Sequence, residues 1–399
     1  MRNKINIACL NKIGLVVALG ISLFFMSCNF CSSQYSYQPP VNVNDGIKIG
    51  SLLQLGMDSA LVSKAIRKIK CGDFNEVHSM LIYKDDMLVL EEYFQGHKYQ
   101  WDAPNYHGEY LQWDKEMIHP IMSCAKSFTS ACIGIAIDKG FIKSADQKIF
   151  DYLPEHQKFN NGGKENITIE HLLTMTSGLS WNEWDAAHGT TANDIDRIYF
   201  ECSDDPIKCV LERELQHPPG EVFNYNGGGM IMLGEILRNS SGLNIDEFSR
   251  KYLFGPQGID NIQWFQYDNG AYACDGSVEL TPRAMLKLGV TYLNNGRWKG
   301  ERLLPAVWTV KSAETFNKNK MINIPGEDSG KNGYGYSWWN NELSRKGEKI
   351  DVYRAGGWGG QAIMVFPELE MVVVFTGGNY AAKSSLFKIV KRYILPAIR

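Results

Sequence analysis

The sequence Ser-Cys-Ala-Lys-Ser-Phe-Thr, residues 123–129, opens a long apolar run that continues to Ile142. Ser123 and Lys126 are three residues apart, so on a helix they lie one above the other on the same face. A serine hydroxyl is a weak nucleophile until a base removes its proton. A lysine can be that base where burial or a second cation favours its neutral amine. The positive end of a helix beginning at Ser123 would also favour negative charge there. The pattern therefore indicates an activated serine, although Ser-x-x-Lys at a helix start is also typical of ordinary N-capping.

Two later stretches supply candidate partners for this pair. Tyr225 precedes an asparagine and three glycines, where backbone can approach a ligand closely, and a tyrosine there could relay the proton that Lys126 removes. Residues 354–361 read Arg-Ala-Gly-Gly-Trp-Gly-Gly-Gln and lead into an apolar strand. Glycines at a strand edge can leave a backbone N–H that points at developing negative charge, as an oxyanion hole requires. The alternatives are a packing aromatic residue for Tyr225 and a plain hairpin turn for residues 354–361.

The chain resembles the serine β-lactamase and penicillin-binding protein superfamily, most closely the class C-like branch of esterases, D-amino-peptidases and oligomer amide hydrolases. The resemblance rests on four strings in the expected order: Met-Ser-Cys-Ala-Lys at 122–126, His-Leu-Leu-Thr-Met-Thr-Ser-Gly-Leu at 171–179, Pro219-Gly220 through Tyr225-Asn226, and residues 356–361. It covers roughly residues 82–394 of this chain. Taken as a set, these strings are far more specific than any one of them.

The resemblance implies a role for each matched residue. Ser123 would be the acylated nucleophile, Lys126 its base, and Tyr225 the residue that completes the proton relay. The oxyanion hole would be the backbone N–H of Ser123 and that of Trp358, or of Gly357 if the match is shifted by one residue. Three matched positions would lie against the substrate: Gly227, Gly357 and Gln361.

Two departures from the family pattern bear on the substrate. The tyrosine motif usually reads Tyr-x-Asn, and Gly227 at the third position lacks the amide that would touch substrate and lysine. The Lys-Thr-Gly motif of β-lactamases is replaced by Ala355-Gly356-Gly357, which has no cation, or by Arg354-Ala355-Gly356, which lacks the hydroxyl. Both departures resemble the esterase and amide-hydrolase relatives more than a true β-lactamase.

We therefore expect an exported serine hydrolase that cleaves an ester or amide bond through an acyl-enzyme on Ser123. The alternatives are a β-lactamase or D,D-peptidase that acts on cell-wall-like amides, and an inactive binding or sensor module. The loops 101–120 and 181–206 are expected to shape the pocket. Five tryptophans either line an apolar cleft there or belong to the core: Trp101, Trp113, Trp181, Trp184 and Trp358.

The periodicity of the chain predicts an α+β fold. Strand patterns occur near both ends and helical patterns in the middle, so we expect one antiparallel sheet, shared by the N- and C-terminal parts and flanked by helices, with an inserted helical lobe. The predicted helices include 58–70, 281–295 and 384–395, and the predicted strands are a hairpin over 77–94 and the segments 334–339, 352–355, 361–366 and 371–376.

The N-terminus has the pattern of a targeting segment. Basic residues precede an apolar stretch, residues 13–26, that is short for a membrane span and suits a signal peptide. It ends Phe-Met-Ser-Cys, which resembles a bacterial lipobox with Cys28 as the lipidated residue. An uncleaved anchor or a plain signal is the alternative. We expect a signal peptide over 1–27, a linker over 28–50 and a hydrolase domain over 51–399, exported and lipid-anchored in the bacterial cell envelope.

Composition limits the partners. The chain has 399 residues and a net charge of −3, which argues against a nucleic-acid partner. Cys202 and Cys209 flank a turn-like segment and could form a disulfide in an oxidising compartment. No Cys-x-x-Cys pair repeats and no His-x-x-x-His occurs, which argues against a structural zinc site. No residue implies another metal or an organic cofactor, so none is expected. The expected partners are a small ester or amide substrate and, through the N-terminal lipid, a membrane; the sequence gives no indication of oligomeric state.

Overall fold

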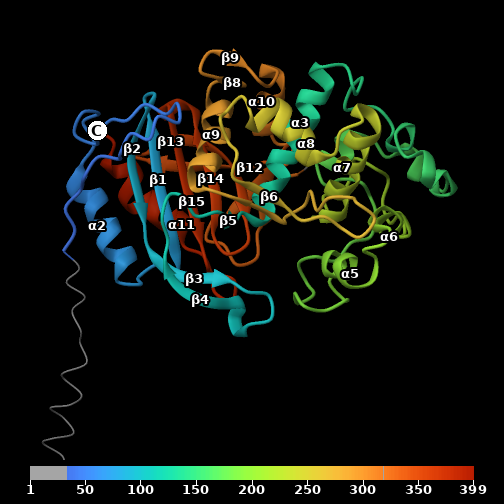
Figure 1. Ribbon diagram of the computed structural model, residues 1–399, viewed down its shortest axis with the longest axis horizontal. Helices are drawn as coiled ribbons and strands as arrows, with labels where there is room; N and C mark the ends of the chain where they lie inside the picture. Colours follow the sequence, from blue (N-terminus) through green and yellow to red (C-terminus); the bar gives the residue numbers. More distant parts are fainter. Residues whose placement is uncertain (1–33, 318) are drawn as a thin grey trace, which may run out of the picture. The chain divides into compact units, whose positions relative to one another are not determined.

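In the computed structural model, which describes residues 34–317 and 319–399, an antiparallel sheet joins the two ends of the chain (Figure 1). Its eight strands follow the order β10–β11–β12–β13–β14–β15–β1–β2. Their bounds are Ile322–Asn323 (β10), Lys331–Tyr334 (β11), Trp339–Arg345 (β12), Glu348–Gly357 (β13), Gln361–Phe366 (β14), Met371–Gly377 (β15), Val77–Lys84 (β1) and Met87–Tyr93 (β2). β1 pairs with β15, with Met80 opposite Phe375 and Ile82 opposite Val373. The predicted sharing of the sheet between the N- and C-terminal parts is confirmed.

One face of the sheet packs against helix α9 (Pro282–Leu293), which is buried nearly all round. Alternate residues of a strand point to opposite faces, and Val372 of β15 and Ile363 of β14 point towards α9. Gly289 of α9 lies against them, because a Cβ on this residue would be 2.6 Å from Val372 Cγ1 and 2.7 Å from Ile363 Cγ2. The helix approaches the sheet this closely because position 289 has no side chain.

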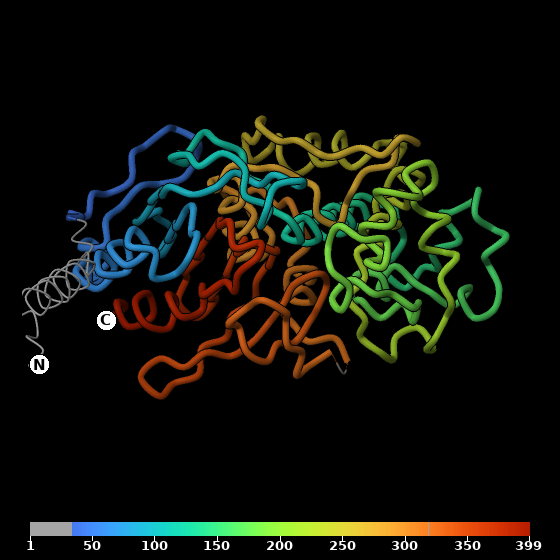
Figure 2. Tube along the Cα trace, turned by 90° about the horizontal axis from the view of Figure 1, so that it is seen from below, coloured from blue at the N-terminus to red at the C-terminus, as the bar shows by residue number. Residues whose placement is uncertain are grey.

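The opposite face is covered by the C-terminal helix α11 (Leu386–Ile389) and the turns that follow it. Arg354 pairs across β13 and β14 with Met364, and its guanidinium lies 5.1 Å from the ring centre of Phe387 in α11. Helix α2 (Ser59–Lys70) packs against the helical turn Val390–Ile394 beyond α11 (Figures 1 and 2). Both faces of the sheet are therefore buried.

A helical lobe is inserted between the N-terminal and C-terminal strands. It lies to the right of the sheet in Figure 1, and the same green and yellow segments lie apart from the blue and red ones in Figure 2. Its helices are α3 (Ala125–Asp138), α4 (Ile169–Leu173), α5 (Asp194–Glu201), α6 (Pro206–Leu211), α7 (Gly227–Ser241) and α8 (Ile245–Ser249). Helix α3 packs against α7 and is buried from Ala125 to Ala136. This burial explains why the sequence after Ser123 is apolar on every side.

Smaller elements complete the fold. They are the pair β3 (Gln95–Tyr99) and β4 (His107–Gln112), the three-stranded sheet of β5 (His119–Pro120), β7 (Val278–Leu280) and β6 (Ile262–Trp264), the pair β8 (Arg297–Trp298) and β9 (Glu301–Arg302), and helix α10 (Ala306–Ala313). The hairpin β3–β4 forms one wall of a cavity into which Ser123 opens. The predicted disulfide between Cys202 and Cys209 is present.

One of the predicted strands is wrong. The segment predicted as a strand over 334–339 is a turn, because β11 ends at Tyr334 and β12 begins at Trp339. The backbone N–H of Ser337 in this turn donates to Leu173 O at 2.9 Å, and Tyr336 and Trp338 are buried. A buried turn and a buried strand have the same apolar composition, so the pattern could not separate them.

The chain before the predicted domain start at residue 51 already contacts the fold. The hydroxyl of Tyr37 donates to Val89 O at 2.7 Å, and Gly50 N–H donates to Leu88 O at 3.0 Å. Residues 37–50 thus follow β2 instead of forming a free linker, because Ile47 and Ile49 pack against the core beside β2. The predicted signal peptide and Cys28 lie outside the described residues. No helix within the described ranges has the length and hydropathy that crossing a membrane requires.

Gly289→Ala is expected to lower the free energy of unfolding by about 1–3 kcal/mol, because the added methyl group overpacks the contact between α9 and the sheet. Urea denaturation measures this change. Lys64→Ala, at an exposed position of α2, is the control and should change stability by less than about 0.5 kcal/mol. Equal losses in both variants would contradict the close approach of α9.

Candidate active site

Ser123 and Lys126 are in direct contact at the start of α3. Ser123 lies in the 3-10 turn Met122–Cys124 that leads into the helix, and Lys126 lies in its first turn. Lys126 Nζ donates to Ser123 Oγ at 2.9 Å and to Asp275 O at 2.7 Å. Only 2% of the Lys126 side chain is exposed. A buried amine one turn from a serine hydroxyl has the geometry of a base and its nucleophile.

Tyr225 lies beside the same lysine. Lys126 Nζ is 4.9 Å from the centre of the tyrosine ring, and the indole of Trp184 stacks on that ring at 4.9 Å. Tyr225 directly precedes Asn226, whose side chain caps α7 by accepting Gly229 N–H at 3.0 Å. Burial and the charge of Glu183 raise the pKa of Tyr225 well above its ordinary value, against a smaller opposing effect of Ser123. The phenol therefore keeps its proton at neutral pH.

Glu183 also belongs to this group of residues, and the sequence analysis did not single it out. Its Oε2 accepts Gly227 N–H at 2.7 Å and Trp181 Nε1–H at 2.8 Å. Its Oε1 lies 4.0 Å from Lys126 Nζ, and 8% of its side chain is exposed. The missing amide at position 227 was the available signal, since a vacated position beside a buried lysine must be filled by another polar group.

Asp275 places a second carboxyl group beside the lysine. Its backbone carbonyl accepts from Lys126, while its side-chain Oδ1 has no hydrogen-bond partner in the part of the chain described. Burial and, to a smaller extent, the charge of Glu183 raise the pKa of Asp275 to about 6, against the opposing charge of Lys126. The Asp275 side chain is thus a buried acid whose charge is only partly compensated.

The turn between β13 and β14 lies against the turn that carries Ser123. A Cβ on Gly357 would lie 2.5 Å from Ile121 O, so the two turns are in backbone contact. Gly359 and Gly360 have φ values of 85° and 95°, in the left-handed region that favours glycine. The Gln361 amide is 1% exposed and donates to Trp358 O at 3.0 Å and Gly377 O at 2.7 Å. Gln361 therefore fixes this turn and does not face the cavity.

In one of the two alignments with the Lys-Thr-Gly motif, the Arg354 guanidinium would bind a substrate carboxylate, but the structure shows that this cation is already paired. Arg354 forms an ion pair with Glu327, and its side chain is 3% exposed. Glu327 is among the residues that line the cavity, whereas Arg354 is buried behind it. The cavity thus lacks the cation that the Lys-Thr-Gly pattern would supply at this position.

Ser123 and Tyr225 open into a cavity of about 850 Å³. Gly357 and Trp358 line it, together with residues from both loops that were expected to shape the pocket. Its aromatic lining comprises Tyr99, Trp101, Tyr106, Trp184, Tyr199, Phe200, Phe265, Trp339, Trp358 and Tyr380. Of the five tryptophans, Trp101, Trp184 and Trp358 line the cavity, whereas Trp113 and Trp181 are buried outside this lining.

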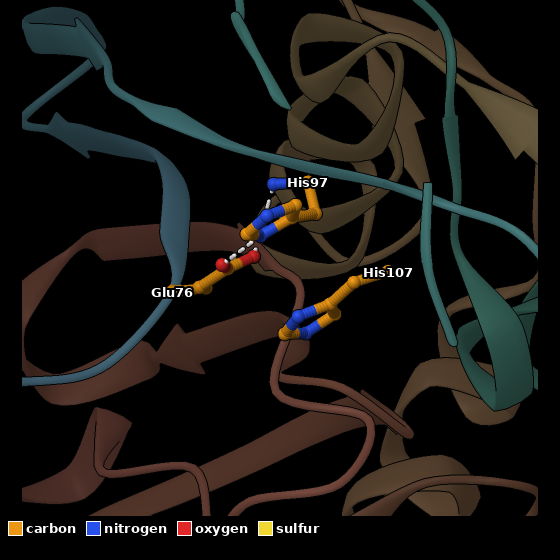
Figure 3. A group of neighbouring side chains, drawn as sticks. All are labelled: Glu76, His97 and His107. Carbon is orange, nitrogen blue, oxygen red and sulfur yellow. Dashed lines mark hydrogen bonds and ion pairs between the residues drawn. The ribbon is translucent and has the colours of Figure 1, made fainter. Parts of the chain in front are cut away.

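A cluster of Glu76, His97 and His107 holds the hairpin β3–β4 in place beside the cavity (Figure 3). Glu76 accepts His97 N–H at 3.0 Å and also contacts its ring, while His107 Nε2 donates to Gly378 O at 3.1 Å. The two imidazoles are stacked, with planes 4° apart and centres separated by 4.3 Å. Nitrogen lone pairs lie in the ring plane, so these parallel rings do not direct them at one shared ion. These contacts attach the hairpin β3–β4 to the end of the main sheet.

Comparison with known proteins identifies the family. The sequence model of the Beta-lactamase family matches residues 78–382. "Protein flp" of Staphylococcus aureus is 24% identical over 239 residues, which are 56% of this chain and 46% of that protein. The chain thus spans about half the length of the curated relatives it matches.

Solved structures share the fold. A Bacillus anthracis protein, provisionally described as a 6-aminohexanoate-dimer hydrolase, is 21% identical with a TM-score of 0.62, covering 78% of this chain and 76% of that one. EstCE1, described as a hydrolase with promiscuous acyltransferase activity, is 14% identical with a TM-score of 0.59, covering 87% of this chain and 97% of its own.

Asp275→Asn is expected to stabilise the fold more near pH 8 than near pH 4. The folded protein binds the Asp275 proton more tightly than the unfolded chain, where the pKa is 3.8. The protonated carboxyl group therefore contributes to the free energy of unfolding below pH 4, and this contribution is lost as the pH rises through about 6. The difference between the two pKa values corresponds to about 3 kcal/mol in the free energy of unfolding, and the uncharged asparagine side chain would avoid this loss at high pH. Chemical denaturation at both pH values measures the difference.

The control for this measurement is Asp260→Asn, which changes an exposed aspartate. It should alter the free energy of unfolding little at either pH. A gain for Asp275→Asn that is the same near pH 4 and pH 8 would show that this carboxyl group does not titrate in the folded protein.

Proposed function

Because the chain belongs to the β-lactamase family, we propose that it is a serine hydrolase that cleaves an ester or amide bond through an acyl-enzyme on Ser123. The observation that carries this proposal is the 2.9 Å hydrogen bond between Ser123 Oγ and the buried amine of Lys126. A structural Ser–Lys contact would not require a cavity in front of the hydroxyl, and Ser123 lines one.

In the proposed reaction, neutral Lys126 takes the proton from Ser123 as Oγ forms a bond to the substrate carbonyl carbon. The backbone N–H groups of Ser123 and Trp358 hold the oxyanion of the tetrahedral intermediate. Tyr225 gives its phenol proton to the departing alcohol or amine and regains one from Lys126. Water then attacks the acyl-enzyme, releases the acid and restores Ser123. Tyr225 suits this step because its raised pKa keeps it protonated before the reaction.

The cavity favours an uncharged, apolar acyl or leaving group. Aromatic side chains form a large part of its lining, and Glu327 neutralises the Arg354 guanidinium, so the position of the family's Lys-Thr-Gly cation offers no free charge to a substrate carboxylate. This supports an ester or amide in preference to a β-lactam. The amide-hydrolase and acyltransferase descriptions of two structural neighbours agree with this class of chemistry. Gln361 would act by holding the Trp358 turn and not by touching substrate.

The cellular location is part of the same proposal. The basic and apolar N-terminal pattern supports export, and Cys28 supports lipid attachment in the cell envelope. The disulfide between Cys202 and Cys209 agrees with an oxidising compartment.

A fluorophosphonate is expected to add once to the protein, at Ser123, and the adduct should be absent from Ser123→Ala. Intact-mass spectrometry followed by peptide mapping measures both. Ser240→Ala, which changes a serine at the end of α7, should be labelled like the wild type. Ester, amide and chromogenic cephalosporin panels then rank the substrates, with esters or amides expected to be hydrolysed faster. Absence of an adduct on folded protein would refute the proposed function, and fast cephalosporin loss would favour the β-lactamase alternative.

Trp101→Ala is expected to raise KM about tenfold for esters with long or aromatic groups, and much less for acetyl esters. The Trp101 ring packs 5.7 Å from Phe200 and 5.9 Å from Tyr106 in the cavity wall, and its loss removes apolar contact area. Steady-state kinetics on an ester series measures this change. Val307→Ala, at an exposed position of α10, is the control. An equal rise in KM for all chain lengths would argue against an apolar binding wall.

A further inference from the structure

The position that lacks the family amide leaves little space for a side chain. Gly227 is the first residue of α7, and a Cβ on it would lie 3.0 Å from Glu183 Oε2, 2.9 Å from Ile195 Cδ1 and 3.3 Å from Asp275 Cβ. These contacts are closer than ordinary van der Waals separation. The glycine therefore lets the Glu183 carboxylate lie this close to the start of α7, because a Cβ at position 227 would force neighbouring side chains, including Glu183, to shift.

Glu183 is held so that one carboxylate oxygen faces the lysine. Gly227 N–H and Trp181 Nε1–H both donate to Oε2, at 2.7 and 2.8 Å. Oε1 remains directed towards Lys126 Nζ at 4.0 Å. A carboxylate with 8% of its side chain exposed is costly unless a cation compensates it, and Lys126 forms an ion pair with it.

We propose that Glu183 replaces the absent amide as the positioning residue of Lys126, and that it supplies a negative charge where an asparagine would supply only a dipole. This inference rests on the proposed serine chemistry. When Lys126 takes the Ser123 proton, the amine becomes an ammonium, and the carboxylate stabilises that charge during acylation.

A merely structural role for Glu183 makes a different prediction. Its carboxylate could serve only to accept the two N–H groups of Gly227 and Trp181. A glutamine side-chain oxygen accepts the same hydrogen bonds but carries no charge. Glu183→Gln therefore separates the charge of residue 183 from its hydrogen bonds.

The test is the rate of fluorophosphonate labelling of Ser123 as a function of pH, which requires no knowledge of the substrate. In Glu183→Gln, the pH of half-maximal rate is expected to move down by about one unit, because a negative charge near the lysine is removed. The maximal rate is expected to fall about tenfold, because the ammonium formed in the reaction loses its counter-charge. Glu221→Gln, at an exposed position, is the control and should keep the wild-type profile.

A residue exchange provides a second arm. Gly227→Asn alone should slow labelling strongly, because the new side chain collides with Glu183. Adding Glu183→Ala should restore a substantial part of the rate by giving the amide its space, with the pH profile of Glu183→Gln. Circular dichroism confirms that each variant compared is folded.

The outcomes distinguish the two proposals. If wild-type protein is not labelled at Ser123, the proposed function fails. If it is labelled and Glu183→Gln has the wild-type pH profile and rate, only the role of Glu183 fails. A folded double variant that is no faster than Gly227→Asn alone would also overturn that role.

Discussion

The pairing of β1 with β15 is the contact on which the rest of the structure depends. It joins residues from opposite ends of the domain, such as Leu81 and Val374, one strand in from the sheet edge at β2. The chain between them therefore leaves this sheet after β2 and returns to it at β10, and the helical lobe belongs to the part that lies outside the sheet. The turn between β13 and β14 then reaches the start of α3, where a Cβ on Gly357 would lie 2.5 Å from Ile121 O. The candidate site lies at this junction of sheet and lobe.

Within the site, burial of Lys126 is the constraint that gathers distant residues. A buried amine needs oxygen partners, because water cannot reach it. Those partners come from three parts of the chain: Ser123 from the preceding turn, the Asp275 carbonyl from the segment before β7, and Glu183 from the loop after α4. Moving any of these segments would leave a buried charge without a partner. The same contacts that satisfy the lysine also hold the serine hydroxyl at the mouth of the cavity.

The cavity wall depends on polar contacts behind it. Hairpin β3–β4 contributes Tyr99 to the aromatic lining, but in the part of the chain that the structure describes its two strands form a sheet separate from the main one. Glu76, His97 and His107 connect it to the end of the main sheet, where His107 donates to Gly378 O. A two-stranded hairpin is marginally stable alone, so such connections decide whether an aromatic wall stays in place. The shape of the cavity and the packing behind its wall are therefore linked.

Much of the fold, and the contact between Ser123 and Lys126, could be predicted from the pattern of residue types over short stretches of sequence. The hairpin β1–β2 was predictable from two apolar runs joined by a polar turn at residues 84–86, and the helical spacing of Ser123 and Lys126 brings them together within one turn. The strand predicted over 334–339 was wrong, because aromatic residues in a buried turn have the composition of a strand. Trp113 and Trp181 could not be separated from Trp101 by sequence, since burial depends on neighbours that fold in from elsewhere.

The sequence by itself determined the family, the fold class and the identity of Ser123, Lys126 and Tyr225 as candidates, because these depend on residue type and short spacing. Only the tertiary structure decided which other residues contact these three side chains. Glu183 is far from Gly227 in the chain, and no local pattern connects a missing amide with a carboxylate in another loop. Their contact exists because folding brings two loops to one buried lysine, where each unfilled position and each uncompensated charge has a free-energy cost.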